Sequence, residues 1–251
     1  DALGRSSGRS FEELRTLTLL AELREPVEGS DGAEHLRQLI RLADNATDPV
    51  LREFLAILAV LAPAEFPSFP AGLLAALRED SSGPDNLELA FLDPVPGREG
   101  HFRPFSRQLA RKLRQHLRET RPDEFRNLNV RAADWYREAA AAQPRSEEGV
   151  RYVHHLFEAR VWDGLDDWMR VHSIPQSLLQ TIWAAARQEG LPAPQFERIA
   201  LRVATHYVKL GSYNHPDVQE ALEPLSRSDD GNVRAWTALK RAEGAALRGQ
   251  Y

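Results

Sequence analysis

Apolar residues recur every three or four positions along most of the chain, which is the spacing of amphipathic helices. In the first 47 residues this pattern predicts two short helices, separated by the polar turn at 29–32. From Pro49 to Leu61 apolar residues occupy nearly all sides of the predicted helix, so we expect it to be buried at the centre of a domain. A second helix is predicted from Ala71 to Arg78.

A segment rich in proline and glycine follows these helices. Residues 92–105 place short apolar flanks on both sides of a Pro/Gly tip, which predicts a β-hairpin. The preceding stretch, residues 87–92, fits either a third short helix or an early strand, because periodicity does not separate the two in so short a run. Two helices, a short third element and a two-stranded wing are the order of a winged-helix domain. The alternative interpretation is an irregular loop between helical repeats.

The last part of the chain contains a short internal similarity. Gly211-Ser212-Tyr213 ends one predicted helix, and Gly249-Gln250-Tyr251 ends another after a spacing of 38 residues, from Gly211 to Gly249. This spacing is close to the roughly 34 to 47 residues of tetratricopeptide (TPR) and HEAT units. We therefore expect a right-handed, TPR-like superhelix that is cut within a repeat. Its last helix is expected to expose an apolar face, made by Val233, Trp236, Leu239, Ala242, Ala246 and Leu247.

Composition is that of an ordered protein. The 251 residues are 42% hydrophobic and 27% charged, enough for one large domain or two modest ones. The chain has no cysteine, which excludes disulfides, thiolate metal ligands and a cysteine nucleophile. No apolar run reaches the roughly 18 residues of a membrane span and no signal-peptide core is present, so we expect a cytoplasmic protein without a membrane partner. The net charge of −5 argues against nucleic-acid binding over the whole surface.

Positive charge is nevertheless concentrated directly after the predicted hairpin. Phe105, Leu109, Leu113 and Leu117 recur every four residues and predict the buried stripe of one helix. Seven basic residues are assigned to the same helix: Arg103, Arg107, Arg111, Lys112, Arg114, Arg118 and Arg121. Those taken as candidate interaction residues are Arg103, Arg107, Arg111, Arg114 and Arg118. In one interpretation these residues contact phosphates or the acidic surface of a partner. In the other they form a solvated face whose charges are neutralised by acids of the fold such as Glu119, Asp123 and Glu124. The net negative charge of the chain favours the solvated face.

No catalytic motif accompanies these residues, and we expect no enzyme activity. None of the three lysines follows a glycine-rich turn, so the chain has no phosphate-binding loop. His154 and Glu158 are four residues apart, but no third ligand is near them in sequence, and no metal site is predicted. Asp163, Asp166 and Asp167 are explained by helix capping rather than by paired-carboxylate catalysis. The five tryptophans are expected to anchor the core of the helical repeats: Trp135, Trp162, Trp168, Trp183 and Trp236.

Several short sequences occur in an order that resembles a known class of proteins. They are His-Phe-Arg-Pro-Phe-Ser at 101–106, Arg-Ala-Ala-Asp-Trp-Tyr at 131–136, Tyr-Val-His-His-Leu-Phe-Glu-Ala at 152–159 and Trp-Asp-Gly-Leu at 162–165. Over roughly residues 48 to 170 this pattern resembles the region after the nucleotide-binding core of STAND-class signal-transduction ATPases. In that class a helical lid, a winged helix and a superhelical repeat sensor follow the ATPase. The chain departs from the class in lacking both Walker motifs.

The resemblance implies three segments and a regulatory function. They are an N-terminal helical segment at 1–47, left from the ATPase lid, a winged-helix-like domain with its trailing basic helix at 48–121, and a helical-repeat domain at 122–251. Such a module relays the nucleotide state of an absent ATPase, where ATP or ADP and Mg would bind. Its partners would be other domains of the same protein, a protein or small-molecule ligand on the repeats, and further copies in an activated oligomer.

The alternative function is that of a winged-helix, DNA-binding transcriptional regulator. Its recognition element would lie between Pro84 and Leu92, which contain no arginine or lysine. Reading base edges requires several such hydrogen-bonding side chains, so this composition counts against nucleic acid as the main partner.

Overall fold

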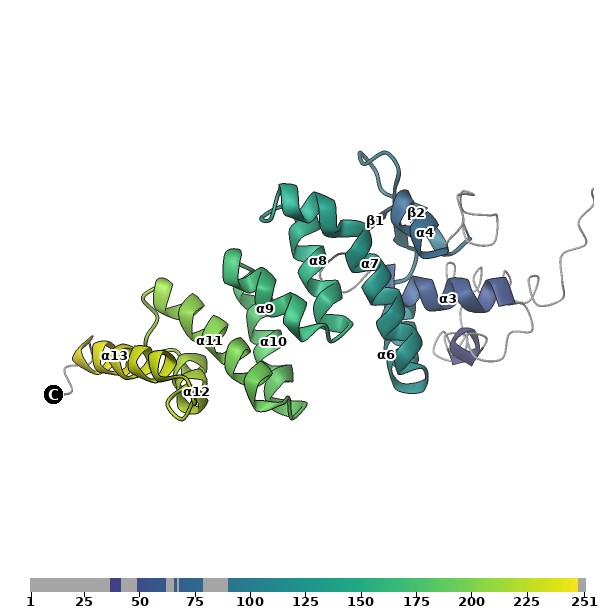
Figure 1. The fold of residues 1–251 in the computed structure, drawn as a ribbon. Helices are drawn as coiled ribbons and strands as arrows, with labels where there is room; N and C mark the ends of the chain where they lie inside the picture. Colours follow the sequence, from purple (N-terminus) through teal and green to yellow (C-terminus); the bar gives the residue numbers. More distant parts are fainter. Residues whose placement is uncertain (1–36, 42–48, 62–65, 67, 79–89, 248–251) are drawn as a thin grey trace, which may run out of the picture. The chain divides into compact units, whose positions relative to one another are not determined.

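The computed structural model describes residues 37–41, 49–61, 66, 68–78 and 90–247 (Figure 1). Helices dominate, and a small three-stranded antiparallel sheet accompanies them, so the mainly helical class is confirmed. The chain forms two compact units, residues 1–135 and 136–251, which are described separately below. The first predicted helix, most of the second, most of the stretch 87–92 and the turn at 249–251 lie outside the described residues.

The first unit is built around the apolar helix α3 (Pro49–Leu61). Every residue from Phe54 to Leu61 is buried, as the nearly all-round apolar pattern predicts. Helix α3 packs against α4 (Ala71–Arg78) and α6 (Arg107–Thr120). Phe54 meets Phe91 edge to face, with ring centroids 5.4 Å apart. Helices over 49–61 and 71–78 are therefore confirmed, and so is the start of α4 at Ala71.

The predicted hairpin is also confirmed, and it belongs to a three-stranded sheet. Strands β1 (Phe69–Pro70), β2 (Leu92–Pro94) and β3 (His101–Pro104) lie in the order β1-β3-β2, with Phe102 opposite Phe69 on one side and Pro94 on the other. Gly97 and Gly100 have φ angles of 74° and 68° in the β2–β3 turn, a conformation that favours glycine. Of the ambiguous stretch 87–92, the described residues Ala90 and Phe91 are helical, and Leu92 is the first residue of strand β2.

Two long helices follow the sheet. Ser106 caps α6, because its Oγ accepts a hydrogen bond from the backbone N–H of Leu109 at 3.2 Å. Helix α7 (Pro122–Ala142) begins with proline and carries Asp123 and Glu124 in its first turn, where acids favour the positive end of the helix dipole. The division between the two units falls within α7.

The second unit consists of helices in succession. They are α8 (Glu147–Glu158), α9 (Trp162–Val171), α10 (Gln176–Gln188), α11 (Ala193–Lys209), α12 (Pro216–Leu225) and α13 (Gly231–Leu247). Helix α8 packs against α9, α10 against α11, and α12 against α13. Helix α11 also packs against α9 and α12, so it is the central element of this unit.

The predicted turn after α11 is confirmed in atomic detail. Gly211 has a φ angle of 68°, and its N–H donates to the Val208 carbonyl at 3.0 Å. The N–H of Ser212 donates to the Tyr207 carbonyl at 2.9 Å, which completes a Schellman motif. The hydroxyl of Tyr213 then donates to Glu243 of α13 at 3.0 Å, so this turn is tied to the last helix.

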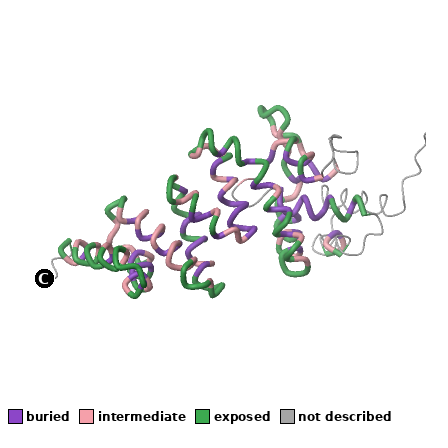
Figure 2. The backbone as a smooth tube through the Cα atoms, viewed as in Figure 1, coloured by how far each residue is buried: buried purple, intermediate pink, exposed green. Residues whose placement is uncertain are grey.

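Buried and exposed stretches alternate along most helices (Figure 2). The tryptophans fall into three groups by their burial. Trp162 and Trp183 are buried, as expected of core anchors, and Trp168 and Trp236 are half-buried. The expectation is wrong for Trp135, whose exposed fraction is 38%. Its ring lies over Gly72 of α4, because a Cβ added to Gly72 would be only 3.3 Å from the nearest carbon of the Trp135 ring. Trp135 therefore covers a gap on the surface of the first unit.

Helix α13 buries small and polar residues rather than its apolar ones. Thr237 and Gly244 are buried, and the Thr237 hydroxyl donates to the Val233 carbonyl at 2.7 Å. Leu239 and Leu247, from the apolar face described above, are exposed.

Candidate functional site

The predicted basic helix exists, and its orientation is as expected. Leu109, Leu113 and Leu117 are each at most 2% exposed and lie on the buried side of α6. Arg107, Arg111 and Lys112 are exposed on the same helix. The four-residue spacing of the leucines therefore predicted correctly which side of α6 faces the core.

The prediction from sequence misplaced both the start and the end of the basic helix. Arg103 belongs to strand β3, and Phe105 precedes the helix, because α6 begins only after the Ser106 cap. Arg121 is the C-cap residue, and its backbone N–H donates to the Leu117 carbonyl at 2.9 Å. The four-residue spacing of apolar positions continued by chance across the end of the strand, so periodicity alone extended the helix too far.

Three of the seven basic residues interact within the first unit. The guanidinium carbons of Arg114 and Arg118 lie 5.8 and 5.3 Å from the ring centroid of Phe125, within the range of cation–π contact. Arg121 forms an ion pair with Glu124 at 3.1 Å. The contacts of Arg114, Arg118 and Arg121 therefore agree with the interpretation of a structural face, whose charges have partners within the fold.

The other four basic residues differ from this group, and we call them the basic surface: Arg103, Arg107, Arg111 and Lys112. All four are exposed, and none of their side chains has a hydrogen-bond, ion-pair or ring partner within the described ranges. Asp93 lies opposite Arg103 across the β2–β3 pairing, so the charge of Arg103 is partly offset. The uncompensated charge is therefore greatest at the three positions on α6.

The three acidic residues that follow the basic surface in the sequence interact with residues outside that surface. Glu119 accepts a hydrogen bond from Gln115 at 3.0 Å. Asp123 pairs with Arg126 at 3.8 Å, and Glu124 pairs with Arg121. The expected neutralisation of the basic face by these three acids is thus wrong for Arg107, Arg111 and Lys112.

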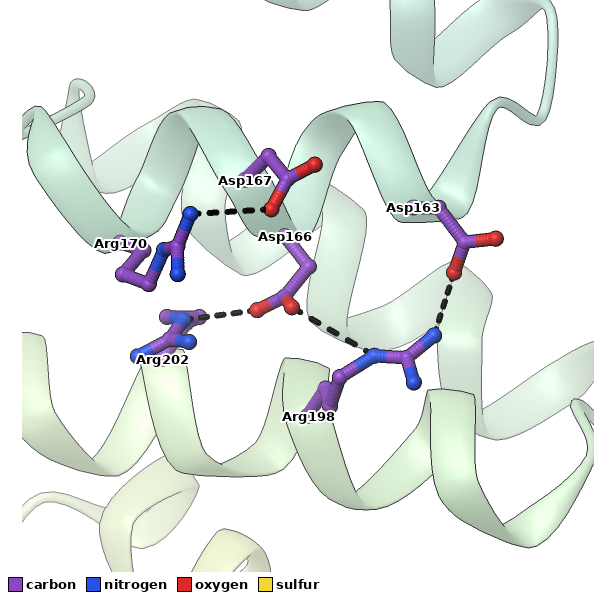
Figure 3. A network of polar contacts seen from close by, with 6 residues as sticks. All are labelled: Asp163, Asp166, Asp167, Arg170, Arg198 and Arg202. Carbon is purple, nitrogen blue, oxygen red and sulfur yellow. Dashed lines mark hydrogen bonds and ion pairs between the residues drawn. The ribbon is translucent and has the colours of Figure 1, made fainter.

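A second polar site joins helices α9 and α11 (Figure 3). The carboxylate of Asp166 accepts from Arg202 Nε at 2.7 Å and lies 3.4 Å from Arg198 Nε, while Arg198 also pairs with Asp163. Asp167 instead pairs with Arg170 of its own helix at 3.3 Å. The N-cap of α9 is Val161, without a side-chain capping bond, so capping does not explain these aspartates, although Asp163 lies in the first turn, where the helix dipole favours an acid. Asp163 and Asp166 are the acidic side of an ion-pair network between two helices.

A third polar cluster is buried along α8. Arg151, His154, His155 and Glu158 are all buried, and His154 Nε2 lies 4.0 Å from Glu158 Oε1. The rings of Tyr136 and His155 are stacked, with their centroids 5.7 Å apart. Burial raises the pKa of the Tyr136 hydroxyl to about 12. No three histidine or acidic side chains come together as a metal site among the residues the structure describes.

The loops of the second unit form an open hollow of about 410 Å³. It is lined by residues 143–146, between α7 and α8, and by residues 171–173, between α9 and α10. Arg145, Ser146 and His172 supply its polar groups, and the His172 ring lies 4.3 Å from that of Trp168. Sequence reasoning missed this hollow, because its two loops are separated by two helices.

Comparisons of the chain with protein-family models, curated proteins and solved structures gave no significant match. No helix in the described ranges combines the length and the apolar character needed to span a bilayer.

Proposed function

We propose that this chain is a regulatory module in which a winged-helix-like domain is followed by a TPR-like helical array, as in STAND-class ATPases. The observation that carries the proposal is the order of elements α3, β1, α4, β2 and β3 with the sheet order β1-β3-β2. In this proposal the β2–β3 hairpin is the wing; it lies beside the short strand β1, and α3 makes the core of the domain. The domain limits 48–121 and 122–251 are part of the same proposal.

The second unit supports the array part of the proposal. Its helices pack in consecutive pairs, and α11 also contacts α9 of the preceding pair, as neighbouring units of a helical array do. The hollow formed by residues 143–146 and 171–173 offers a place for a ligand on this array. Its mixed polar and apolar lining suits a peptide segment or a small polar molecule.

In this function the chain transmits a signal and performs no reaction. ATP or ADP and Mg would bind to a separate nucleotide-binding domain of the same protein, since the sequence contains no phosphate-binding loop. The winged-helix-like domain would respond to that nucleotide, and the array would bind the regulatory ligand or protein. Activation would then involve assembly of several copies.

Two experiments test this proposal. Calorimetric titration of the 251-residue chain with Mg·ATP should give no binding at micromolar concentrations, and binding there would contradict the assignment. In the full-length protein, amide exchange of α3 and α4 should differ between the ADP and ATP states. Identical exchange in the two states would show that the domain does not relay nucleotide state.

A further inference from the structure

We propose that the basic surface, formed by Arg103, Arg107, Arg111 and Lys112, binds the phosphate backbone of nucleic acid without reading its sequence. This activity goes beyond the regulatory function proposed above and needs neither nucleotide nor the helical array. Nucleic-acid backbones are bound mainly by arginine and lysine side chains that neutralise phosphates and release counterions.

The first argument is local charge. Residues 90–121 contain eight basic and three acidic residues, a net charge of +5 within a chain of net charge −5. The nearby acids Glu119, Asp123 and Glu124 have other partners, as described above. Positive charge on α6 is therefore left for an external anion.

The second argument is spacing. Arg107 and Arg111 are one helical turn apart, which corresponds to about 6 Å along the helix axis. Successive phosphates on one DNA strand rise about 3.4 Å along the duplex axis and are also displaced sideways by the helical rotation, so the distance between neighbours is larger than this rise. The two guanidinium groups can therefore reach neighbouring phosphates, and Lys112 adds a third cation on α6. Arginine suits this role, because its planar fork can donate two hydrogen bonds to one phosphate.

The third argument distinguishes nucleic acid from an acidic protein. None of the exposed large hydrophobic side chains in the described residues lies on β3 or α6. Protein interfaces usually contain an apolar or aromatic centre, whereas nucleic-acid interfaces are polar and positively charged. Polar Gln108 and Gln115 lie among the cations on the exposed side of α6. This composition favours a phosphate backbone.

The test measures binding of the 251-residue chain to a fluorescein-labelled 20-base-pair DNA by anisotropy, at 50 and 200 mM NaCl. Three phosphate contacts predict a slope of about −2.7 for log K against log salt, equivalent to a loss of roughly 40-fold over this range. The triple variant Arg107→Gln, Arg111→Gln, Lys112→Gln should bind at least about 10-fold more weakly at 50 mM and lose most of the slope.

A matched control removes three exposed arginines elsewhere: Arg126→Gln, Arg170→Gln and Arg227→Gln. Both variants lose three positive charges, so a general effect of net charge would weaken them equally. The proposal predicts that the control stays within about twofold of the unmodified chain. Circular dichroism melting curves establish that both variants are folded.

Three outcomes would overturn the proposal. They are no measurable DNA binding at 50 mM NaCl, equal weakening of the two variants, and stronger binding of a labelled poly-glutamate peptide than of DNA at equal charge. The last would assign the basic surface to an acidic protein. A negative result would leave the nucleotide-relay experiments untouched, because those measure α3 and α4 in the full-length protein.

Discussion

Replacing Asp166 by asparagine should destabilise the second unit by about 2 to 3 kcal/mol. The carboxylate of Asp166 is only 11% exposed and lies between two arginines of α11. Asparagine keeps the shape of the side chain, but it removes the charge and replaces one carboxylate oxygen by an amide NH2 group, which donates and cannot accept. One of the two arginines then faces a donor instead of an acceptor, and the hydrogen bond to the other loses the charge of its acceptor. The side chain of Arg202 is 19% exposed, so its guanidinium cannot recover full hydration.

The magnitude follows from the two contacts considered separately. A charge-assisted hydrogen bond such as that from Arg202 Nε, at 2.7 Å, contributes about 1.5 to 3 kcal/mol. The longer contact with Arg198 adds less than about 1 kcal/mol, because Arg198 is 42% exposed and still pairs with Asp163. The total remains below the roughly 3 to 5 kcal/mol of a fully buried pair, since Asp166 is open to some solvent.

Urea unfolding followed by circular dichroism is the suitable assay, because guanidinium chloride would itself screen the ion pairs. Asp167→Asn is the matched control: it is one position away, 70% exposed, and should cost less than about 0.5 kcal/mol. A double-mutant cycle with Arg202→Gln should give a coupling energy near 2 kcal/mol. Equal midpoints for Asp166→Asn and Asp167→Asn would refute the reasoning and show that burial adds nothing here.

Three further predictions concern packing and ionisation. Leu113→Ala should cost about 2 to 5 kcal/mol in urea unfolding and Arg111→Ala less than about 1, and the reverse order would mean that α6 faces the other way. Gly149→Ala should be strongly destabilising, because its Cβ would collide with the backbone carbonyl of Pro144, whereas Gly164→Ala, whose nearest neighbour would be a side-chain carbon of Val161 at 3.2 Å, should cost less; equal melting temperatures would contradict this packing. Burial raises the pKa of the Tyr136 hydroxyl from its ordinary value of 10.0 to about 12, so stability should fall as the pH rises between these values, by up to about 1.4 kcal/mol per pH unit. Tyr136→Phe should lose that dependence, as measured by urea unfolding at pH 9 to 11.5.

The parts of the fold that sequence predicted well depend on neighbours along the chain. The leucines of α6 repeat within one helix, and the turn of the hairpin contains two glycines that adopt positive φ angles. Gly211 likewise ends α11 through bonds to residues at most five positions away. Helix periodicity and glycine turns of this kind can be predicted from a single sequence, because they depend on residues that are close together in the chain.

The parts that sequence missed depend on contacts between distant residues. Asp166 and Arg202 are 36 positions apart, and nothing in the spacing of either helix pairs them. Arg160 is another example: it ends α8 with a φ angle of 61°, where glycine would be expected. Its guanidinium lies over Phe157 at 4.5 Å and pairs with Glu189 at 2.6 Å, so packing holds a conformation that the sequence did not indicate.

The arginines illustrate why proximity in sequence was a poor guide to the candidate site. Glu119, Asp123 and Glu124 lie within about two helical turns of the basic residues, and that nearness predicted a neutralised face. Pairing on a helix, however, requires a spacing of three or four residues on one side, and these acids meet that condition only with Gln115, Arg126 and Arg121. In the second unit, acids of α9 meet arginines of α11 instead, across a helix interface. Arg107, Arg111 and Lys112 have neither arrangement, so their charge is available to an external anion.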